Sequence, residues 1–297
     1  MSDLIPFLGA AQVLAALTPE RAVQAIVEAL QGGLDPAADP PRTATPLRKG
    51  EFLMMPSESA SAAGVKVLTL APDNPRFGRP RVQGFYALFD PETLTPQALL
   101  DGASVTSVRT PAVSLAAVRS ALLRTSEPLD VVVFGAGPQA RDHLRTLEDL
   151  VRERRPIASV TTVRSDSLPP TAELGRAGLV ICATTARTPL FDSAVLRDDV
   201  VVIAVGSHEA DARELDSALL GRAQVVVEDT ATAMRECGDV VMAIADGALT
   251  ADQLIPFAEV CRGRVALRAE RPVVFKSSGM SWEDLVIAEA IVEAYDP

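Results

Sequence analysis

Apolar and polar residues alternate in two different ways along this chain, and the change comes near Asp130. After that point short aliphatic runs separate stretches with helical spacing, beginning with VVVFG at 131–135 and a predicted helix over 138–153. Strands that alternate with helices in this manner predict a parallel sheet with helices on both faces. The further predicted strands cover residues 159–163, 178–184, 201–206 and 224–229.

The first third of the chain has a different pattern. Residues 8–31 predict two short helices, the second capped by Thr18 with Pro19 in its first turn. A loop rich in Gly, Pro and Asp follows at 32–42. Short strand-like segments separated by turn-rich sequence then predict an antiparallel or mixed sheet, at residues 51–56, 64–70 and 82–90.

Two more helices complete the prediction. One covers about 109–124 and ends at the sequence EPLD, and the other covers 281–296. We interpret the second as an amphipathic helix that opens at Ser281 and has acidic residues in its first turn.

Composition narrows the classes of function. The 297 residues are 48% apolar, enough for one large or two ordinary domains with a substantial core. The net charge is −11 and no basic stripe is present, which disfavours nucleic acid as a partner. The N-terminus lacks a leader pattern, and no apolar run reaches the ~20 residues that span a bilayer, so we expect a soluble cytoplasmic protein with no membrane partner. The cysteines have no metal-ligand spacing and are expected to be free thiols: Cys182, Cys237 and Cys261.

The stretch VVVFGAGPQA, residues 131–140, is the strongest local motif. In a Rossmann unit the first glycine makes the tight turn, the second lets the backbone approach the pyrophosphate, and a third small residue lets helix and strand pack closely. Gly135, Gly137 and Ala140 stand at these positions, with Pro138 and Gln139 between the last two. The strand before and the helix after favour cofactor binding at the helix N-terminus. The alternative is a tight turn without a ligand.

The end of the second strand bears on the choice of cofactor. Binders of NAD place an acidic residue there for the ribose 2′-hydroxyl. Here Arg164 and Ser165 stand at that point, and a guanidinium and a hydroxyl suit a 2′-phosphate. We therefore expect NADPH, with NADH possible. In the alternative, Arg164 is a surface charge and Asp166 takes the role of the acid.

Several further stretches occur in the order seen in one protein family. They are LRKGEFLMMPS, GVKVLTLAPDNPRFGRP, LLDGASVTSVRTPAVSLAAV, VVVFGAGPQA, AVGSHEADARELD, VVVEDTATAMRECGDV and VVFKSSGMSWEDLVIAEAI. On these motifs the chain resembles the ornithine cyclodeaminase/mu-crystallin family from about Pro41 to Tyr295. The resemblance implies an α/β fold, with a Rossmann-type parallel sheet domain at 113–276. A smaller α+β substrate-binding and dimerisation domain would be formed by 1–112 with 277–297. It also implies hydride transfer between a nicotinamide and the Cα of an amino or imino acid.

The resemblance assigns three cations to the substrate. Arg42, Lys66 and Arg109 match the positions that hold an α-carboxylate in the family, and a small acid needs such charge-assisted donors. Arg48 is the rival for the role of Arg42. Taken singly, each of these residues is an ordinary surface cation. Beside two arginines and partly buried, Lys66 is expected to have a lowered pKa and to exchange a proton with the imine nitrogen.

The sequence departs from the cyclodeaminases at one position. Those enzymes have an Asp after the Gly of the VG loop, whereas this chain has His208. An imidazole does not replace a fixed carboxylate, which disfavours ornithine cyclisation and favours imine reduction. His208 is a candidate proton donor near the nicotinamide, and the alternative is a loop residue with local hydrogen bonds. Glu209 and Asp211 are expected to be solvated.

The resemblance also implies further contacts with the cofactor. These residues follow strands of the Rossmann domain or lie near the nicotinamide or its phosphates: Ala183, Thr184, Thr185, Val205, Gly206, Ser277 and Thr110. Lys276, Asp229 and Asp239 are expected to be structural, and His143 to be packed or on the surface. The two histidines and the scattered acids show no spacing for a metal.

These residues lead to one preferred function. It is the NADPH-dependent reduction of Δ1-pyrroline-2-carboxylate or Δ1-piperideine-2-carboxylate to L-proline or L-pipecolate by a homodimer. An ornithine cyclodeaminase or an amino-acid dehydrogenase of the same family is the first alternative. A non-catalytic NADPH-binding protein like mu-crystallin is an alternative of another class.

Overall fold

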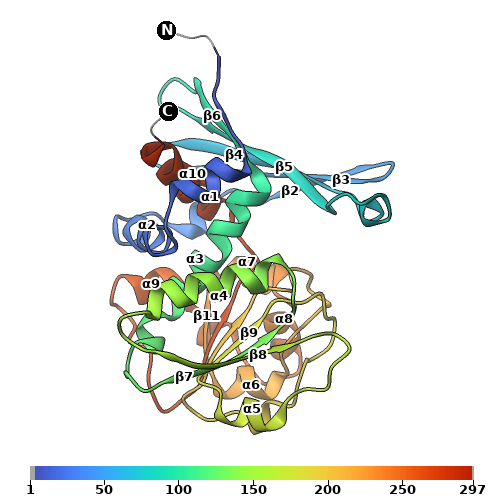
Figure 1. Cartoon of the computed structure of the whole chain (residues 1–297), viewed down its shortest axis with the longest axis vertical. Helices are drawn as coiled ribbons and strands as arrows, with labels where there is room; N and C mark the ends of the chain where they lie inside the picture. The colour runs from blue at the N-terminus through green and yellow to red at the C-terminus, as the bar shows by residue number, and fades with distance from the viewer. Residues whose placement is uncertain (1–3, 296–297) are drawn as a thin grey trace. The chain divides into compact units, whose positions relative to one another are not determined.

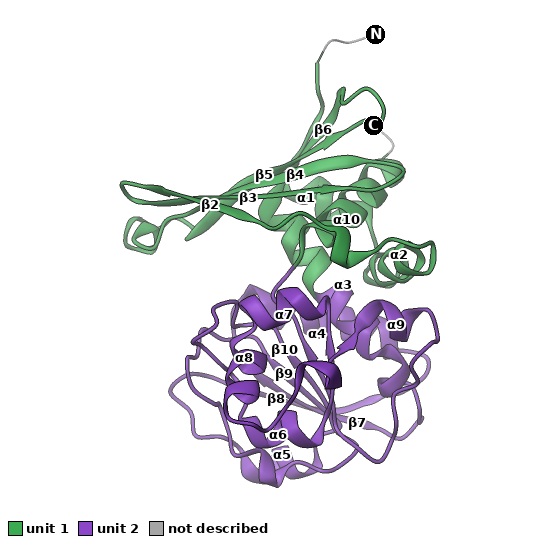
Figure 2. Ribbon diagram, turned by 180° about the vertical axis from the view of Figure 1, so that it is seen from behind, with its two compact units in different colours: residues 1–110, 280–297 green, residues 111–279 purple. Residues whose placement is uncertain are grey.

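The computed structural model describes residues 4–295 and divides into two compact units. Unit 1 comprises residues 1–110 with 280–297, and unit 2 comprises residues 111–279 (Figure 2). The chain passes from one unit to the other within helix α3 (Gly102–Leu122) and again after Gly279. In the part of the chain that is described, no helix is long and apolar enough to cross a membrane.

Unit 1 is built on a six-stranded mixed sheet with the order β1-β6-β5-β4-β3-β2 (Figure 1). Neighbouring strands are antiparallel except that β1 is parallel to β6. The three predicted strands correspond to β3, β4 and β5, which confirms the expected mixed sheet, whereas the sequence pattern does not predict the other three. The strands are β1 (Phe7–Leu8), β2 (Thr43–Leu47), β3 (Gly50–Glu58), β4 (Ala63–Leu70), β5 (Val82–Phe89) and β6 (Pro96–Asp101).

Helices cover one face of this sheet. Helices α1 (Ala10–Ala16) and α10 (Ser281–Ala294) pack on the strands, and α2 (Pro19–Gln31) packs on α10. Met55, Lys66, Tyr86 and Leu100 form a row of register partners across β3, β4, β5 and β6, and all four side chains are buried on this face. The inner face therefore carries a lysine in the middle of an otherwise largely apolar layer.

Helix α10 differs from its prediction. Most of its residues are buried, including both acids of the first turn, so the amphipathic interpretation is wrong and the helix lies inside the core of unit 1. Its N-cap is Met280 and not Ser281. The N-cap of α2 is Thr18, as predicted, with its side chain accepting a hydrogen bond from the N–H of Arg21.

Helix α3 begins earlier than the expected residue 109. The Asp101 side chain accepts hydrogen bonds from the backbone N–H and the hydroxyl of Ser104, at 2.8 and 2.6 Å. A carboxylate at this place satisfies a free N–H of the first turn and starts the helix at Gly102. Pro111 lies within the helix and does not end it.

Unit 2 contains a seven-stranded sheet in which every pairing is parallel, with the order β12-β11-β13-β10-β9-β7-β8. All residues of β9, β10, β11 and β13 are buried, as expected for strands covered on both faces. The predicted parallel α/β fold is confirmed, and β13 is a strand that the sequence pattern does not predict. The strands are β7 (Leu129–Phe134), β8 (Ile157–Val163), β9 (Leu179–Cys182), β10 (Val201–Ala204), β11 (Gln224–Val227), β12 (Ile255–Pro256) and β13 (Val273–Lys276).

The helices of unit 2 pack around this sheet (Figures 1 and 2). They are α4 (Pro138–Val151), α5 (Thr171–Arg176), α6 (Ser217–Arg222), α7 (Thr230–Glu236), α8 (Gly238–Ala245) and α9 (Phe257–Cys261). Short 3-10 helices occur in both units, at Pro36–Ala38, Asn74–Phe77, Ser193–Val195 and Ala251–Gln253.

The strand order of unit 2 reverses at β7. This strand pairs with β8 on one side and with β9 on the other. In open parallel sheets ligands bind outside the carboxyl ends of the strands at such a switch point. The loops after β7 and β9 are therefore the place to look for a cofactor site.

Candidate functional site

The loop after β7 contains two glycines, Gly135 and Gly137, whose surroundings differ. Gly135 has φ 108°, and a Cβ there would lie 2.4 Å from the carbonyl oxygen of Ala183, so the fold itself requires a glycine. Gly137 is the N-cap of α4, and a Cβ there would meet no atom of residues 4–295 within 4 Å. The fold does not explain the second glycine, whereas a pyrophosphate close to the backbone does.

The rest of the loop suits the same ligand. Pro138 is the first residue of α4, Gln139 follows, and Ala140 is buried where the helix packs. The Gln139 Oε1 atom is buried and has no hydrogen-bond partner among the described residues. The first turn of α4 thus offers free helical N–H groups and a positive helix end to a phosphate. These features fit a dinucleotide.

A buried glutamate holds the next two loops of the sheet edge together. The side chain of Glu214 accepts hydrogen bonds from the N–H and hydroxyl of Thr184 at 2.8 and 2.7 Å, and from the N–H of Gly206 at 2.8 Å. A Cβ on Gly206 would lie 2.0 Å from the carbonyl oxygen of Thr184, so these loops touch. Sequence reasoning did not assign a role to Glu214, although it lies in the VG-loop motif. It binds the backbone N–H groups of Thr184 and Gly206, two of the residues expected at the cofactor. The others expected there lie next to them in the same two loops: Ala183, Thr185 and Val205.

A second buried network of charged side chains holds the loop that follows β10. Lys276 donates to the carbonyl oxygen of Ser207 at 2.6 Å and pairs with Asp239 at 3.1 Å. Asp239 in turn accepts hydrogen bonds from the N–H groups of Glu214 and Leu215, both at 2.8 Å. The structural roles expected for Lys276 and Asp239 are confirmed.

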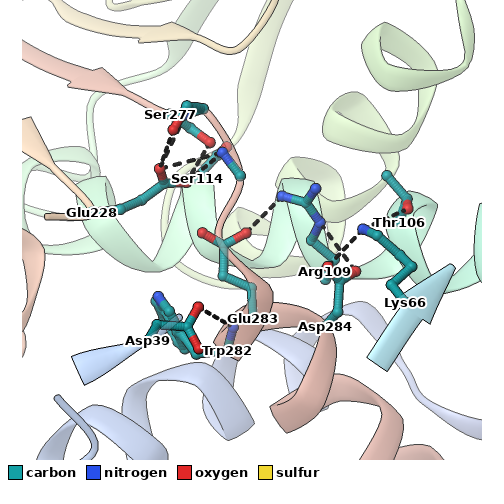
Figure 3. A network of polar contacts seen from close by, with 12 residues as sticks. Asp39, Lys66, Thr106, Arg109, Ser114, Glu228, Ser277, Trp282, Glu283 and Asp284 are labelled. Carbon is teal, nitrogen blue, oxygen red and sulfur yellow. Dashed lines mark hydrogen bonds and ion pairs between the residues drawn. The ribbon is translucent and has the colours of Figure 1, made fainter. Parts of the chain in front are cut away.

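Three other expectations concern unit 2. Ser277 is buried and donates a hydrogen bond to Glu228, which also accepts one from the N–H of Ser278 (Figure 3). Asp229 caps α7 through the N–H of Thr232, which confirms a structural role. His143 is fully buried, with Nδ1 2.7 Å from the carbonyl oxygen of Gln139, so it is packed as expected.

Arg164 and Ser165 follow β8 and are exposed. The residue before them, Val163, accepts a hydrogen bond from the N–H of Gly135 at 2.9 Å. The two side chains therefore start next to the glycine loop, where the ribose of a bound dinucleotide is expected. Asp166 is also exposed, in the turn that follows.

Unit 1 holds a group of four buried charged side chains, which we call the buried charge group: Lys66, Arg109, Glu283 and Asp284. Lys66 Nζ lies 2.6 Å from Asp284 Oδ2, and Arg109 Nη1 lies 2.6 Å from Glu283 Oε2. Arg109 Nε is also 3.4 Å from Asp284 Oδ1 (Figure 3). The two carboxylates come from the first turn of α10, and the cations come from β4 and α3.

The two carboxylates balance two of the expected cations within the chain. Asp284 pairs with Lys66, and Glu283 pairs with Arg109. Lys66 is fully buried, and the expected shift of its pKa is confirmed. Burial lowers the pKa of Lys66 to about 8, the Asp284 carboxylate opposes this, and the Arg109 charge adds to it. A lysine with such a pKa can give and take a proton near neutral pH.

Arg42 and Arg48 lie at opposite ends of β2. Arg42 directly precedes Thr43, which pairs with Met54 on β3. Continuing this antiparallel register by one residue places Arg42 opposite Met55. Met55 in turn pairs with Lys66 on β4. Arg48 is exposed in the turn between β2 and β3. The five residues of β2 separate their Cα atoms by six strand steps, about 20 Å in all. The register places Arg42, and not Arg48, in line with Lys66.

The remaining candidates are His208 in unit 2 and Thr110 in unit 1. His208 is exposed in the loop after β10. Its neighbours Glu209 and Asp211 are exposed and pair with Arg187 at 2.7 and 2.6 Å, which agrees with their expected solvent contact. Thr110 is buried and adjoins Arg109 in α3.

The fold and glycine loop of unit 2 suit a dinucleotide, and the relatives of this chain identify it as a nicotinamide-dependent oxidoreductase. A family model described as ornithine cyclodeaminase/mu-crystallin family matches residues 7–166 and 169–296. The chain belongs to the ornithine cyclodeaminase/mu-crystallin family, as its sequence motifs indicated.

One relative and two solved structures show the extent of the similarity. The chain is 31% identical over 264 residues to a Delta(1)-pyrroline-2-carboxylate reductase of Colwellia psychrerythraea, covering 82% of this chain and 83% of that one. The Thermococcus litoralis Delta(1)-pyrroline-2-carboxylate reductase in complex with NADH and L-proline superposes with a TM-score of 0.82 at 25% identity, over 98% and 97% of the two chains. A probable ornithine cyclodeaminase from Bordetella pertussis gives a TM-score of 0.86 at 26% identity, over 98% and 97%.

Proposed function

We propose that this protein reduces a cyclic imino acid, Δ1-pyrroline-2-carboxylate or its six-membered homologue Δ1-piperideine-2-carboxylate, to L-proline or L-pipecolate. The observation that carries the proposal is the buried lysine with a pKa of about 8 beside a buried arginine in unit 1. The similarity to pyrroline-2-carboxylate reductases over most of the chain supports it.

The proposal gives each cation a task. Arg109 and Arg42 bind the substrate carboxylate, because a guanidinium pairs with a carboxylate through two parallel hydrogen bonds. Glu283 and Asp284 hold Arg109 in place while it does so. Lys66, as the ammonium, gives a proton to the imine nitrogen and becomes a neutral amine. A protonated C=N has a more electrophilic carbon, so the proton and the hydride act together.

The cofactor is held by unit 2 in this proposal. When bound, the reduced nicotinamide supplies the hydride that C2 of the imine accepts. Gly135, Gly137 and the first turn of α4 hold the pyrophosphate, and the loop fixed by Glu214 supports the rest. Arg164 and Ser165 bind a 2′-phosphate, which makes NADPH the preferred cofactor, with NADH as a weaker one. The relative from Thermococcus litoralis has NADH bound, so the proposed preference for NADPH rests on Arg164 and Ser165 of this chain.

Two features of this chain argue against the two alternative functions. An ornithine cyclodeaminase would need a carboxylate where this chain has the exposed His208. A non-catalytic binding protein would have no use for a buried lysine with a lowered pKa, since a buried ion pair adds little stability compared with apolar residues. His208 remains in this proposal as a second proton donor, near the nicotinamide.

We also propose a homodimer formed through the outer face of the unit 1 sheet. That face carries exposed apolar side chains from strands β1, β3 and β5, namely Phe7, Phe52, Met54 and Phe85. An apolar sheet face of this kind is normally covered, and a second copy of the same face covers it by two-fold symmetry. The three cysteines are free thiols, which suits the cytoplasm.

A panel of substrates tests the function. The purified protein is mixed with each cyclic imine, L-ornithine and L-alanine, with NADPH or NADH, and nicotinamide oxidation, ammonia and amino acid products are measured. The proposal predicts oxidation of NADPH with equal formation of L-proline or L-pipecolate. Ammonia release from ornithine without imine reduction would identify a cyclodeaminase, and tight NADPH binding without turnover would identify a binding protein.

A further inference from the structure

The carboxyl ends of five neighbouring strands of unit 2 lie in one row. Phe134 of β7 pairs with Cys182 of β9, which pairs with Ala204 of β10. Ala204 pairs with Lys276 of β13, which pairs with Val227 of β11. The residues one step further along each strand therefore follow one another across this edge of the sheet, and they are Gly135, Ala183, Val205, Ser277 and Glu228.

This edge has the glycine loop at one end and Glu228 at the other. A dinucleotide at the switch point crosses the carboxyl ends of the strands, with its pyrophosphate at the glycine loop. Its adenosine half points toward β8, because the ribose contact comes from the end of the second strand. We therefore expect the nicotinamide half on the other side of the glycine loop, over the loops after β9, β10 and β13.

Glu228 is a buried carboxylate whose partners are all uncharged. Its Oε1 atom accepts hydrogen bonds from the hydroxyl of Ser277 at 2.5 Å and from the N–H of Gly279 at 3.1 Å (Figure 3). Its Oε2 atom accepts one from the N–H of Ser278 at 3.0 Å. Both oxygens accept, as in a charged carboxylate, whereas a carboxylic acid would have to donate a hydrogen bond. No ion pair joins Glu228 to a cation of the described residues.

The other buried charges at this edge leave an excess of negative charge. Lys276 and Asp239 pair at 3.1 Å and balance each other. Glu214 is fully buried and accepts its hydrogen bonds from uncharged groups of the loops after β9 and β10. Three buried carboxylates therefore accompany one buried cation.

The one further buried cation among the described residues of unit 2 lies at the other end of the sheet. It is Arg155, which donates to the carbonyl oxygens of Leu122 and Glu127. Both carbonyls precede β7, so this guanidinium lies at the amino ends of the strands. It does not balance the carboxylates at the carboxyl ends.

Holding a turn does not require a buried charge. The uncharged carboxamide of glutamine can accept hydrogen bonds from the same kinds of donors, and burying a charge without a counter-charge is unfavourable. The excess of negative charge is explained by a cation that the chain itself does not supply. A nicotinamide ring provides one, because it is neutral when reduced and positively charged when oxidised.

We propose that Glu228 and Glu214 stabilise the oxidised nicotinamide relative to the reduced one, and thereby make the bound cofactor a stronger hydride donor. The hydride takes one proton and two electrons from C4 of the reduced ring to the acceptor carbon, and the ring is left with one positive charge. Negative charge fixed at the sheet edge lowers the free energy of this charged product more than that of the neutral reactant. The inference requires a bound nicotinamide and goes beyond the proposed imine substrate.

Binding of the two redox forms of the cofactor tests the inference without a substrate. The Kd values of NADPH and NADP⁺ are measured by fluorescence titration and calorimetry for the wild type, Glu228→Gln and Glu214→Gln. Both forms have the same phosphates, so the ratio of the two Kd values reports the charge of the ring. Glu148→Gln is the matched control, because it removes the same charge from an exposed position of α4.

Glu228→Gln should raise the Kd of NADP⁺ about tenfold and leave that of NADPH unchanged, and Glu214→Gln should act in the same direction. A tenfold change in the ratio equals a rise of about 30 mV in the reduction potential of the bound cofactor. Glu148→Gln should keep the ratio of the wild type. Glu228→Asp, which keeps the charge but shortens the side chain, should also keep it.

Two results would overturn the inference. One is a ratio unchanged in both glutamine variants, and the other is an equal rise of both Kd values, because a disturbed turn weakens both forms alike. Thermal unfolding without cofactor identifies a variant that does not fold, and the other variant then decides.

The same measurements separate this inference from the proposed function. If the wild type reduces no cyclic imine but the ratio depends on Glu228, the proposed function is wrong and the inference stands. If the wild type reduces the imine and the ratio does not depend on either carboxylate, the inference alone is rejected.

Discussion

The Nζ atom of Lys66 lies 2.6 Å from the Oδ2 atom of Asp284, and both side chains are buried in unit 1. Burial lowers the pKa of Lys66 from 10.5 to about 8, and the Asp284 carboxylate limits the shift. This pair therefore sets the pH at which Lys66 loses its proton, and it gives the proposed reaction a pH dependence of known sign.

Imine reduction is expected to fall as the pH rises through about 8, because the reaction consumes the protonated form of Lys66. Oxidation of L-proline is expected to rise over the same range, because it needs the neutral amine. Profiles of kcat/KM against pH in both directions check this. Asp284→Asn removes a charge that raises the pKa of Lys66, so both transitions should move to lower pH. Profiles without a transition between pH 7 and 9 in either direction would refute the role of Lys66.

The two glycines of the cofactor loop should respond differently to alanine. Gly137→Ala adds a Cβ that would have no atom of the described residues within 4 Å, so the melting temperature should change little. The Kd for NADPH should rise at least about tenfold, equal to about 1.4 kcal/mol, because the methyl group occupies the space for the pyrophosphate. Gly135→Ala forces a left-handed backbone and a contact of 2.4 Å with Ala183, so it should lower stability itself. Calorimetry of binding and thermal unfolding separate the two effects, and a Gly137→Ala variant with normal affinity would argue against a dinucleotide at this loop.

Arg164→Ala should weaken NADPH binding and leave NADH binding unchanged. A charge-assisted hydrogen bond contributes about 1.5–3 kcal/mol, so the Kd for NADPH should rise by about tenfold or more. Arg154→Ala is the matched control, since this exposed arginine of unit 2 lies in the turn after α4 and carries the same charge. Equal losses of affinity for both cofactors would assign the 2′-phosphate to another residue.

Phe85→Glu should convert the proposed dimer into monomers. Phe85 is 40% exposed on the outer face of the unit 1 sheet, and a charge there would be buried without a partner in the dimer. Leu168→Glu is the control, because Leu168 is 90% exposed in unit 2. Sedimentation of the variants gives the mass in solution. A wild-type protein that sediments as a monomer at micromolar concentration would disprove the dimer.

Much of unit 2 is predictable because its strands are fully buried. A strand covered on both faces reads as an unbroken aliphatic run, and VVVF, VVIA and VVV do so. The position of β13 between β10 and β11 does not follow from the pattern, since it depends on how distant segments pair. The role of Gly135 in the turn was predictable because it directly follows a strand. The role of Glu214 was not, because it depends on the backbone N–H groups of two distant loops that its side chain binds.

The buried charge group shows why the site of unit 1 was harder to predict. Lys66 and Asp284 are 218 residues apart in the sequence, and nothing local couples them. Two acids in the first turn of a helix fit the helix dipole, so the sequence explains Glu283 and Asp284 without a partner elsewhere in the chain. The structure buries α10 on most sides and turns both carboxylates to the cations. The relation depends on tertiary packing, which the spacing of residues does not report.

Transfer of a label tests the central proposal most directly. The protein is supplied with Δ1-pyrroline-2-carboxylate and with NADPH that carries deuterium on C4 of the nicotinamide, and the proline formed is analysed by mass spectrometry and NMR. If the protein reduces the imine, deuterium from one face of the nicotinamide appears at C2 of L-proline, and Lys66→Met lowers the yield. Proline without deuterium for either labelled face, or no proline at all, would contradict the account.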